Sequence, residues 1–458
     1  MRILLINPPA INFYHRVGLT LPPLGLGYIA AVLVDAGHQV QIADLNVEPL
    51  NYDRYPYENF NLVGISVDTT RYPVSLKIAQ AAKRHGRPVV VGGPHVTFFD
   101  EETLRTGLVD YVVRNEGEHI MLDLVRHLED GHNLEEVQGI SSMQDGQFVR
   151  TPAAPFVQDL DALPFPARNL LPLDRYITTL RKRPMATMVT SRGCPYNCEF
   201  CSASQFSGVK WRTRSVGNIL EELEFLYDRY GYRAVAFLDD NFTLNPDRVL
   251  EVCKGIMGKG WDLFWWCFSR VDTIVRNPKM VADMARSGVR EIFIGFESGS
   301  QKVLDQIGKN LSVDKAVEAV KILQKHHIAV WGSFMIGALN ETKAMINETI
   351  RFAKRLNPDQ AQFSIMTPYP GTRLYASVKD RLLTHDWKRY WGGEPIIRLD
   401  KVSPKDMERL IFKAYLSFYL RFRKLFRLGI PYFYNLMGGY RRHKKAPLRM
   451  EHGDWVPI

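Results

Sequence analysis

The chain has 458 residues, of which 46% are hydrophobic and 24% are charged, a composition that supports packed domains and excludes global disorder. No apolar run reaches the roughly 18 residues that cross a bilayer, and the start MRILLINPP lacks the cleavage site of a signal peptide. We therefore expect a cytoplasmic protein. The formal net charge of +10 suits nucleic acid, an anionic membrane surface or an acidic substrate, and most of the excess falls between Lys405 and Arg449.

Residues 1–150 alternate between strand-like and helix-like stretches. Apolar runs occur at 3–6, 40–43, 63–67, 89–91 and 111–113, and helical spacing is found at 27–36 and 74–84. Continuous Val- and Ile-rich runs separated by helix-length segments are typical of buried parallel strands. This pattern predicts a doubly wound, Rossmann-like open sheet that binds its ligand at the carboxyl ends of the strands.

The second half of the chain begins after a proline-rich stretch. Residues 151–185 contain Pro152, Pro155, Pro164, Pro166 and Pro172 and are predicted to be a linker. The alternation restarts with strand-like runs at 187–190, 234–238, 263–268, 291–295, 330–336 and 361–365. Right-handed crossovers would curl these units into a partial TIM-type (β/α)6 barrel over residues 186–375. Residues 376–458 are predicted to form a helical, basic and aromatic C-terminal region.

Three of the five cysteines lie close together, at Cys194, Cys198 and Cys201. They follow the first predicted barrel strand, where barrel active sites are built, and three thiolates can hold one soft metal centre. A zinc site would need a fourth ligand, and no His occurs between His132 and His326. Cys253 and Cys267 lie within a helical and a strand pattern, so we interpret them as core residues.

The CxxxCxxC spacing, with Phe200 before the last cysteine, resembles the signature of the radical S-adenosylmethionine (SAM) superfamily. The resemblance implies a 4Fe–4S cluster whose open iron binds SAM, and a 5′-deoxyadenosyl radical formed by reductive cleavage of SAM. It also implies a flavodoxin- or ferredoxin-type reductant. Phe200 would lie beside the adenine. Further SAM contacts are expected at the ends of the next strands, namely Asp239, Arg270, Glu297 and Ser298, although such residues also cap helices.

The N-terminal half resembles the cobalamin-binding domain that precedes the barrel in one large radical SAM class. The cobalamin contacts expected from this resemblance are Pro8, Ser66, Thr69, Thr70, Gly92, Gly93, Glu116 and Gly117. One departure concerns the DxHxxG motif, which is absent after the first strand, so we expect no His below the cobalt. The departure leaves open a domain that binds substrate or nothing.

The C-terminal tail carries aromatic residues at mostly helical spacings, with basic residues between them. The aromatic residues are Phe412, Tyr415, Phe418, Tyr419, Phe422 and Phe426, and the basic ones are Arg421, Arg423, Lys424 and Arg427. One interpretation is an amphipathic helix that touches a membrane or lines a site for a large apolar substrate. The other is a helix that packs its aromatic stripe on the barrel.

The leading hypothesis is a cobalamin-dependent radical SAM enzyme that methylates an unactivated carbon of a lipid, tetrapyrrole or natural product. The layout resembles class B methylases, hopanoid-modifying enzymes and the anaerobic Mg-protoporphyrin monomethyl ester cyclase. One alternative is cyclisation or oxidation without methyl transfer. Another is RNA modification, which the absence of any Cys before Cys194 disfavours. A non-catalytic cobalamin carrier would not need three cysteines at this spacing.

Overall fold

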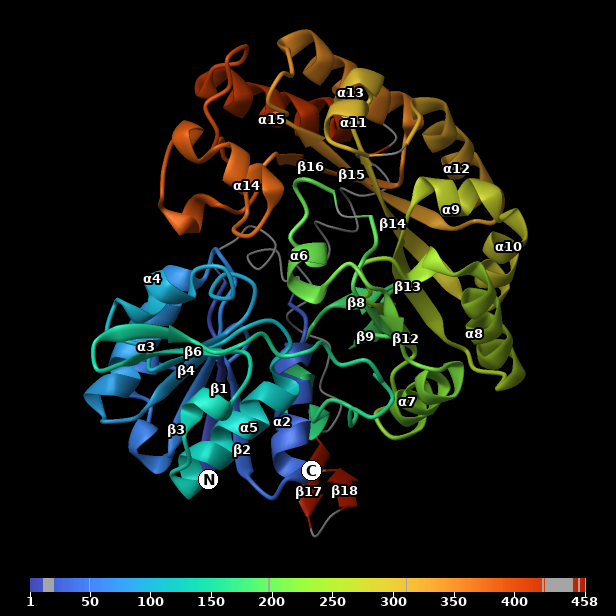
Figure 1. Ribbon diagram of the computed structural model, residues 1–458. Helices are drawn as coiled ribbons and strands as arrows, with labels where there is room; N and C mark the ends of the chain where they lie inside the picture. The colour runs from blue at the N-terminus through green and yellow to red at the C-terminus, as the bar shows by residue number, and fades with distance from the viewer. Residues whose placement is uncertain are drawn as a thin grey trace.

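The computed structural model describes residues 1–10, 20–48, 50–196, 198–309, 311–421, 424, 448–451 and 454–457. Two seven-stranded sheets lie at the centres of two α/β units (Figure 1). Residues 11–19, which include most of the loop that lacks the DxHxxG motif, are outside the described residues, and so are Phe422, Arg423, Phe426 and Arg427.

The N-terminal sheet has the strand order β2-β1-β3-β4-β5-β6-β7. Its first five strands are parallel, and β6 and β7 continue the sheet antiparallel. The strands are β1 (Arg2–Asn7), β2 (Gln39–Asp44), β3 (Leu62–Ser66), β4 (Val89–Gly92), β5 (Tyr111–Val113), β6 (Ile140–Gln144) and β7 (Gln147–Arg150). The order reverses between β1 and β3, which confirms a doubly wound sheet of the flavodoxin-like kind.

Helices cover both faces of this sheet because the side chains of each strand alternate. Ile3 and Leu5 of β1 pack in one hydrophobic core, whereas Leu4 and Ile6 pack in another on the opposite face. The first core lies under α2 (Leu24–Asp35) and α5 (Gly117–Asp130), and the second under α3 (Tyr72–Arg84) and α4 (Asp100–Leu104).

The second sheet has the order β16-β15-β14-β13-β12-β9-β8 and curls into a half barrel (Figure 1). Six strands are parallel, and β8 (Thr179–Leu180) pairs antiparallel with β9. The six are β9 (Arg183–Met188), β12 (Ala234–Phe237), β13 (Phe264–Ser269), β14 (Val289–Glu297), β15 (Ala329–Ile336) and β16 (Gln360–Ile365). The predicted partial barrel is therefore present, but its first strand begins at Arg183 rather than at residue 187, since β8 and β9 form a hairpin at the end of the proline-rich stretch.

The outer face of the half barrel is covered by helices, and the core between helices and sheet contains both Cys253 and Cys267. The helices are α7 (Val216–Asp228), α8 (Pro246–Gly258), α9 (Val271–Arg276), α10 (Pro278–Arg286), α11 (Gln301–Gln306), α12 (Val313–Lys325) and α13 (Lys343–Leu356). The short helices α6 (Ala203–Ser207) and α14 (Arg373–Ser377) follow the cysteine loop and β16.

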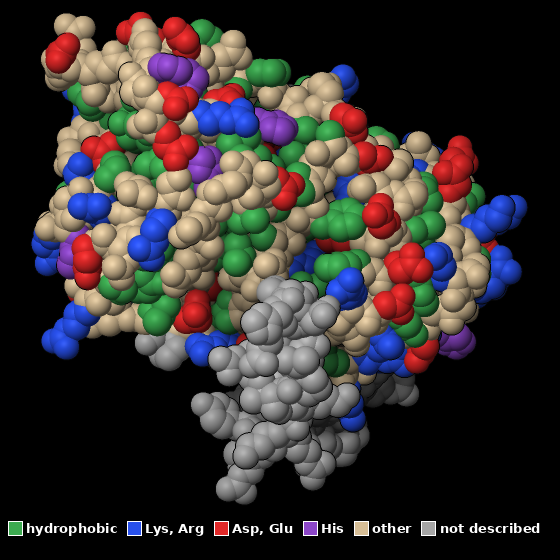
Figure 2. Space-filling view, turned by 90° about the horizontal axis from the view of Figure 1, so that it is seen from below, with side chains coloured by type: hydrophobic (Ala, Val, Ile, Leu, Met, Phe, Trp, Pro, Cys, Tyr) green, Lys and Arg blue, Asp and Glu red, His purple; other side chains and the backbone are tan. Residues whose placement is uncertain are grey.

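Helix α15 (Pro404–Tyr419) packs on β16, the last strand of the sheet. Phe418 is fully buried there, as the second interpretation of the tail predicts. The C-terminal region is helical at α15 as predicted, but near its end β17 (Leu448–Glu451) and β18 (Asp454–Pro457) pair as an antiparallel hairpin. Among the described residues, no helix is long and apolar enough to cross a membrane. On the face shown in Figure 2, acidic and basic side chains are interspersed.

Candidate active site

The cysteine loop follows β9 and is fixed by backbone contacts before the first thiol. The strand pair β10 (Ser191–Arg192) and β11 (Arg212–Thr213) holds its start, and the Cys194 amide donates to the Gly208 carbonyl at 3.1 Å. Gly193 has φ +85, and a Cβ there would lie 2.4 Å from the Lys210 carbonyl oxygen. Only glycine fits this position, since the backbone is left-handed and another strand approaches closely.

The three thiols of the loop are free and partly accessible, whereas Cys253 and Cys267 are buried. Burial raises the pKa of Cys194, and it raises the pKa of Cys201 to about 11. The charge of Cys198 contributes to the raised pKa of both of these thiols. Among the described residues, no group of three His, Cys, Asp or Glu side chains is arranged to hold a metal ion. The donor set nevertheless fits an iron–sulfur cluster, because three uncommitted thiols share one short loop.

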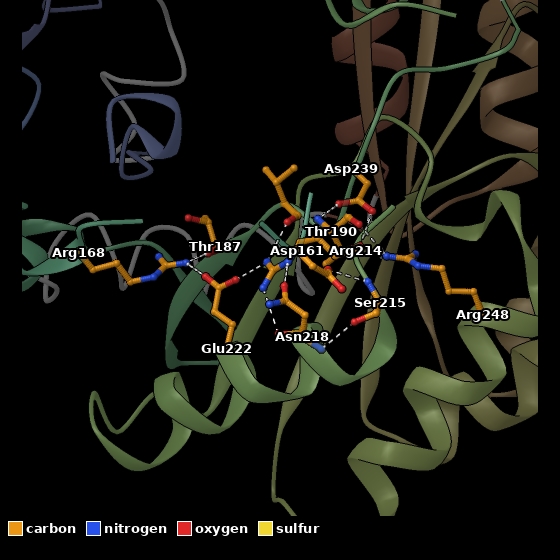
Figure 3. A network of polar contacts seen from close by, with 11 residues as sticks. Asp161, Arg168, Thr187, Thr190, Arg214, Ser215, Asn218, Glu222, Asp239 and Arg248 are labelled. Atoms are coloured by element: carbon orange, nitrogen blue, oxygen red, sulfur yellow. Dashed lines mark hydrogen bonds and ion pairs between the residues drawn. The ribbon is translucent and has the colours of Figure 1, made fainter. Parts of the chain in front are cut away.

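A buried polar network holds the strand end that leads into this loop (Figure 3). The Asp239 carboxylate accepts from the Thr190 amide at 2.6 Å, the Thr190 hydroxyl at 2.5 Å and the Ser191 hydroxyl at 2.6 Å. Arg248 of α8 donates to the Thr190 carbonyl at 2.9 Å. Asp239 is only 1% exposed, so its carboxylate serves to position the loop.

The same network continues behind β9, where Glu222 of α7 lies between two arginines (Figure 3). Its carboxylate accepts from Arg168 at 2.6 Å and also from Arg214. Arg168 donates in addition to the Thr187 carbonyl, and Arg214 to the Val189 carbonyl. Because each of these charges is paired and hydrogen-bonded, burial of the network is tolerated.

A cavity of about 360 Å³ lies at the junction of the two units. Its N-terminal wall comes from α2, from the carboxyl ends of β3, β4 and β5 and from the start of α5, and its other wall comes from the barrel. The barrel residues are Val189, Ser191, Arg192, Phe206, Ser207, Leu238 and Asp240. The cavity is therefore at the switch-point edge of the first sheet, and it reaches the residues that directly precede Cys194.

Two arginines of the barrel join this loop to the N-terminal unit. Arg192 donates to Glu118 at 2.6 Å and lies 3.3 Å from a Glu116 oxygen. Arg212 donates to both Glu116 oxygens, at 2.8 and 2.9 Å. All four side chains are at least 86% buried, the exposed fractions being 14% or less. The sequence did not predict these four residues as a set, because no sequence motif links the two arginines to the two glutamates.

Each of the two units matches a known domain family. The Radical SAM superfamily model matches residues 188–353, and the B12 binding domain model matches residues 14–125. An uncharacterized methyltransferase of Pyrococcus horikoshii is 40% identical over 431 residues, which cover 92% of this chain and 93% of the relative. The chain belongs to the radical SAM superfamily. Its cofactors are those of the two matched domains, a 4Fe–4S cluster with SAM and a cobalamin.

Two further proteins are similar to this radical SAM protein over most of their length. The anaerobic magnesium-protoporphyrin IX monomethyl ester cyclase of Rubrivivax gelatinosus is 27% identical, over 92% of this chain and 78% of the cyclase. The structure of the radical SAM methyltransferase TsrM from Kitasatospora setae, with cobalamin and a [4Fe-4S] cluster bound, superimposes with a TM-score of 0.70 at 18% identity, over 89% of this chain and 84% of TsrM. This structural likeness supports the fold.

The radical SAM barrel brings the predicted SAM residues to one end but commits some of them to other contacts. Glu297 forms an ion pair with Lys309 at 2.8 Å. The Ser298 hydroxyl lies 2.9 Å from that of Thr349 inside the core. Arg270 stacks over the Tyr196 ring of the cysteine loop, 3.6 Å from the ring centre. Phe200 packs at the edge of an apolar cluster that includes Met335.

Asp240, which the sequence did not single out, lines the cavity instead of Asp239. Its side chain is exposed at the cavity, and partial desolvation there together with the charge of Asp239 raises its pKa to about 6. The charge of Asp240 also acts on Cys194 and Cys201. Sequence position is the signal that could have found it, because Asp240 lies in the loop directly after β12, two residues from Leu238, which also lines the cavity.

Five of the eight predicted cobalamin residues line the cavity: Ser66, Gly92, Gly93, Glu116 and Gly117. The other three do not. The Thr70 hydroxyl donates to Asp68 at 2.8 Å, Thr69 lies 3.4 Å from the ring nitrogen of His95, and the Pro8 carbonyl accepts from Asn46. Their polar atoms serve the loops after β1 and β3. Gly93 passes so close to β3 that a Cβ would lie 2.6 Å from the Val67 carbonyl oxygen.

Proposed function

We propose that this protein transfers a methyl group from cobalamin to an unactivated carbon of an apolar small molecule. The observation that carries the proposal is the shared wall between the cavity and the cysteine loop, in which Ser191 and Arg192 line the cavity and Cys194 follows them. Bound cluster and SAM would supply a carbon-centred radical, and cobalamin would supply the methyl group. The two chemistries need neighbouring sites, and this fold provides them.

The chain's own residues would bind and orient these groups. Cys194, Cys198 and Cys201 would hold the cluster, and Phe200, Arg270 and Asp240 would surround SAM. Gly92 and Gly93 let the backbone approach a large flat ligand closely, and Ser66, Glu116 and Gly117 offer polar contacts around it. We assign Asp239 a positioning role, because its oxygens are already used by Thr190 and Ser191.

An apolar substrate is supported by the inner face of the half barrel. Four aromatic rings cross β13, β14 and β15 there in an unbroken row, with neighbouring ring centres 5.0 to 5.3 Å apart: Trp266, Phe268, Phe293 and Trp331. They point away from the helix-covered core, and three of them are partly exposed. Such a row favours a planar or hydrocarbon skeleton, as in a tetrapyrrole or a lipid.

Cyclisation without methyl transfer is the second candidate, and one observation favours it: the similarity to the magnesium-protoporphyrin cyclase. The relative named as a methyltransferase is more similar, at 40% against 27% identity. A flavodoxin- or ferredoxin-type protein would deliver the electron. We place the enzyme in the cytoplasm, where a reducing environment keeps three free thiols available for iron, with a membrane surface as a contact of its C-terminal region.

The test begins with the protein purified without oxygen, reconstituted with iron and sulfide, and incubated with hydroxocobalamin. Wild type is compared with the Cys194→Ala/Cys198→Ala/Cys201→Ala variant and with Cys253→Ala, which removes a buried cysteine instead. We expect about four irons per chain in wild type and Cys253→Ala but not in the triple variant, and one retained cobalamin in all three.

Methyl-labelled SAM and a low-potential reductant such as dithionite, which reduces both the cluster and the bound cobalamin, then separate the two candidates. Methyl transfer is supported if the label appears in the retained cobalamin and 5′-deoxyadenosine is formed as well. The 5′-deoxyadenosine carries no label, because it does not contain the methyl group of SAM. If SAM is cleaved reductively and the cobalamin stays unlabelled, the methyl-transfer proposal is wrong and cyclisation is favoured. If iron binds without cobalamin, the role of the cavity is overturned.

A further inference from the structure

Helix α15 and its C-cap residue Leu420 present a partly exposed apolar stripe in the described structure. Phe412, Leu416 and Leu420 are 64%, 38% and 61% exposed. They are four residues apart, so they lie above one another on one face of the helix. Tyr415, 36% exposed, widens the stripe on one side. Large exposed side chains are normal singly, but a stripe along a helix indicates an interaction surface.

The helix is fixed in this orientation by two tyrosines, of which Tyr415 borders the stripe and Tyr419 is only partly exposed. The Tyr415 hydroxyl donates to the Phe363 carbonyl at 2.9 Å and accepts from the Phe363 amide. The Tyr419 hydroxyl does the same with Ala361, donating at 2.8 Å. These bonds satisfy the outer edge of β16 in place of a further strand. The helix therefore cannot roll its stripe onto the barrel without breaking them.

Positive charge surrounds the stripe. Lys405, Arg409 and Lys413 are exposed on α15 itself, and Arg351, Lys354 and Arg355 are exposed on the neighbouring α13. Only Glu348 and Glu408 oppose them as exposed, unpaired acids on these two helices, because Asp406 forms an ion pair with Lys343 at 2.7 Å.

The sequence concentrates its net charge in α15 and in the stretch of chain that follows it. Residues 405–449 contain twelve Lys and Arg but only two acidic residues, Asp406 and Glu408. This segment therefore accounts for the whole formal charge of +10, and the rest of the chain has equal numbers of acidic and basic residues. A basic helix with an apolar stripe matches the surface of an anionic bilayer in both its charge and its hydrocarbon. Nucleic acid would use the charge but not the stripe.

We propose that α15 docks this protein on the surface of anionic membranes, with Phe412, Leu416 and Leu420 in the acyl boundary and the flanking cations against the lipid headgroups. The contact is peripheral, and no described helix is suited to span the bilayer. The inference rests on the membrane contact named in the proposed function, but it needs neither the cluster nor the cobalamin, so it can fail without the proposed methyl transfer failing.

Flotation of the full-length protein with vesicles tests this proposal. One vesicle is phosphatidylcholine alone, and the other contains phosphatidylglycerol in addition. We compare wild type with Phe412→Ser/Leu416→Ser and with a control, Phe225→Ser/Met257→Ser, whose residues are 38% and 40% exposed on α7 and α8. We expect binding to the anionic vesicles only, weakened by salt, with a loss of about tenfold or more in the α15 variant and none in the control. Equal melting temperatures show that both variants fold.

Three results would overturn the proposal. The first is no binding of wild type to anionic vesicles. The second is equal vesicle binding of wild type and the α15 variant. That result would mean that the basic residues alone attract the protein to the vesicles and that the apolar stripe plays no part, as expected of a nucleic-acid-binding surface. The third is a wild-type dimer that the α15 substitutions convert to a monomer without changing vesicle binding, which would assign the stripe to a second copy of the chain.

Discussion

The Arg192 guanidinium lies 2.6 Å from the Glu118 carboxylate and ties the cysteine loop to the cobalamin-binding unit. Arg192 comes two residues before Cys194, and Glu118 is in the first turn of α5, where it lines the cavity. The pair is almost completely buried, with exposed fractions of 14% and 5%. Together with the ion pairs of Glu116, this pair spans the boundary between the cysteine loop and the cavity of the N-terminal unit.

Removing Glu118 should destabilise the protein, because Arg192 then stays buried with Glu116 as its remaining acidic partner. For Glu118→Ala we expect a loss of about 2–4 kcal/mol in unfolding free energy, seen as a lower melting temperature, and weaker binding in a hydroxocobalamin titration. The control is Glu101→Ala, whose ion pair with Arg105 is exposed by 48% and 59% and should cost at most about 1 kcal/mol. If the two substitutions lowered the unfolding free energy equally, the buried Arg192–Glu118 ion pair would not have the stabilising role given to it here.

The Gly93 backbone should tolerate no side chain. Its φ is +119, and the added Cβ would meet the Val67 carbonyl at 2.6 Å. Gly93→Ala should therefore cost roughly 3 kcal/mol or more in stability through strain and displacement of β3, and should reduce cobalamin affinity. Gly86→Ala is the matched control, with φ +67 and no atom within 4 Å of its Cβ, so only about 1 kcal/mol of left-handed strain is expected. A Gly93→Ala protein that unfolds and binds cobalamin like Gly86→Ala would refute this account of the turn.

The Glu291 carboxyl should make stability depend on pH. Its pKa is raised to about 7, mainly by burial. The charge of Arg181 lowers the pKa and the charge of Asp359 raises it, but both effects are smaller than that of burial. The folded-state pKa lies above the unfolded value of 4.5, so the folded form binds the proton more tightly. The stability that this proton provides is complete below about pH 4.5 and is lost as the pH rises through 7.

Glu291→Gln removes this dependence while keeping an acceptor for the Gln360 amide, which donates to Glu291 at 2.9 Å. Compared with wild type, the variant should gain stability steadily from pH 5 to pH 8, by about 1–3 kcal/mol in total. Melting temperatures of the cluster-free protein across this range measure the difference. A constant difference between variant and wild type would show that Glu291 titrates normally.

The sequence by itself determined the order of elements, and it predicts the loop that binds the cluster. Val- and Ile-rich runs at helix-length spacing identified parallel strands, because strands covered on both faces are apolar throughout. Cys194, Cys198 and Cys201 were identifiable because a cluster is bound by residues close together in the chain. Gly92, Gly93 and Ser66 were identifiable because strand ends in a doubly wound sheet meet at one edge.

Only the tertiary structure decided which neighbouring side chain faces the cavity. Asp239 and Asp240 are adjacent acids at the end of β12, and packing against Thr190 and Ser191 commits the first and leaves the second in the cavity. The Arg192–Glu118 pair joins residues 74 positions apart, on elements with no common motif. The hydrophobic pattern of a segment indicates which face of its own helix or strand a residue occupies. A cavity between two units depends on how the surfaces of both units pack together, and no single segment of the sequence determines this packing.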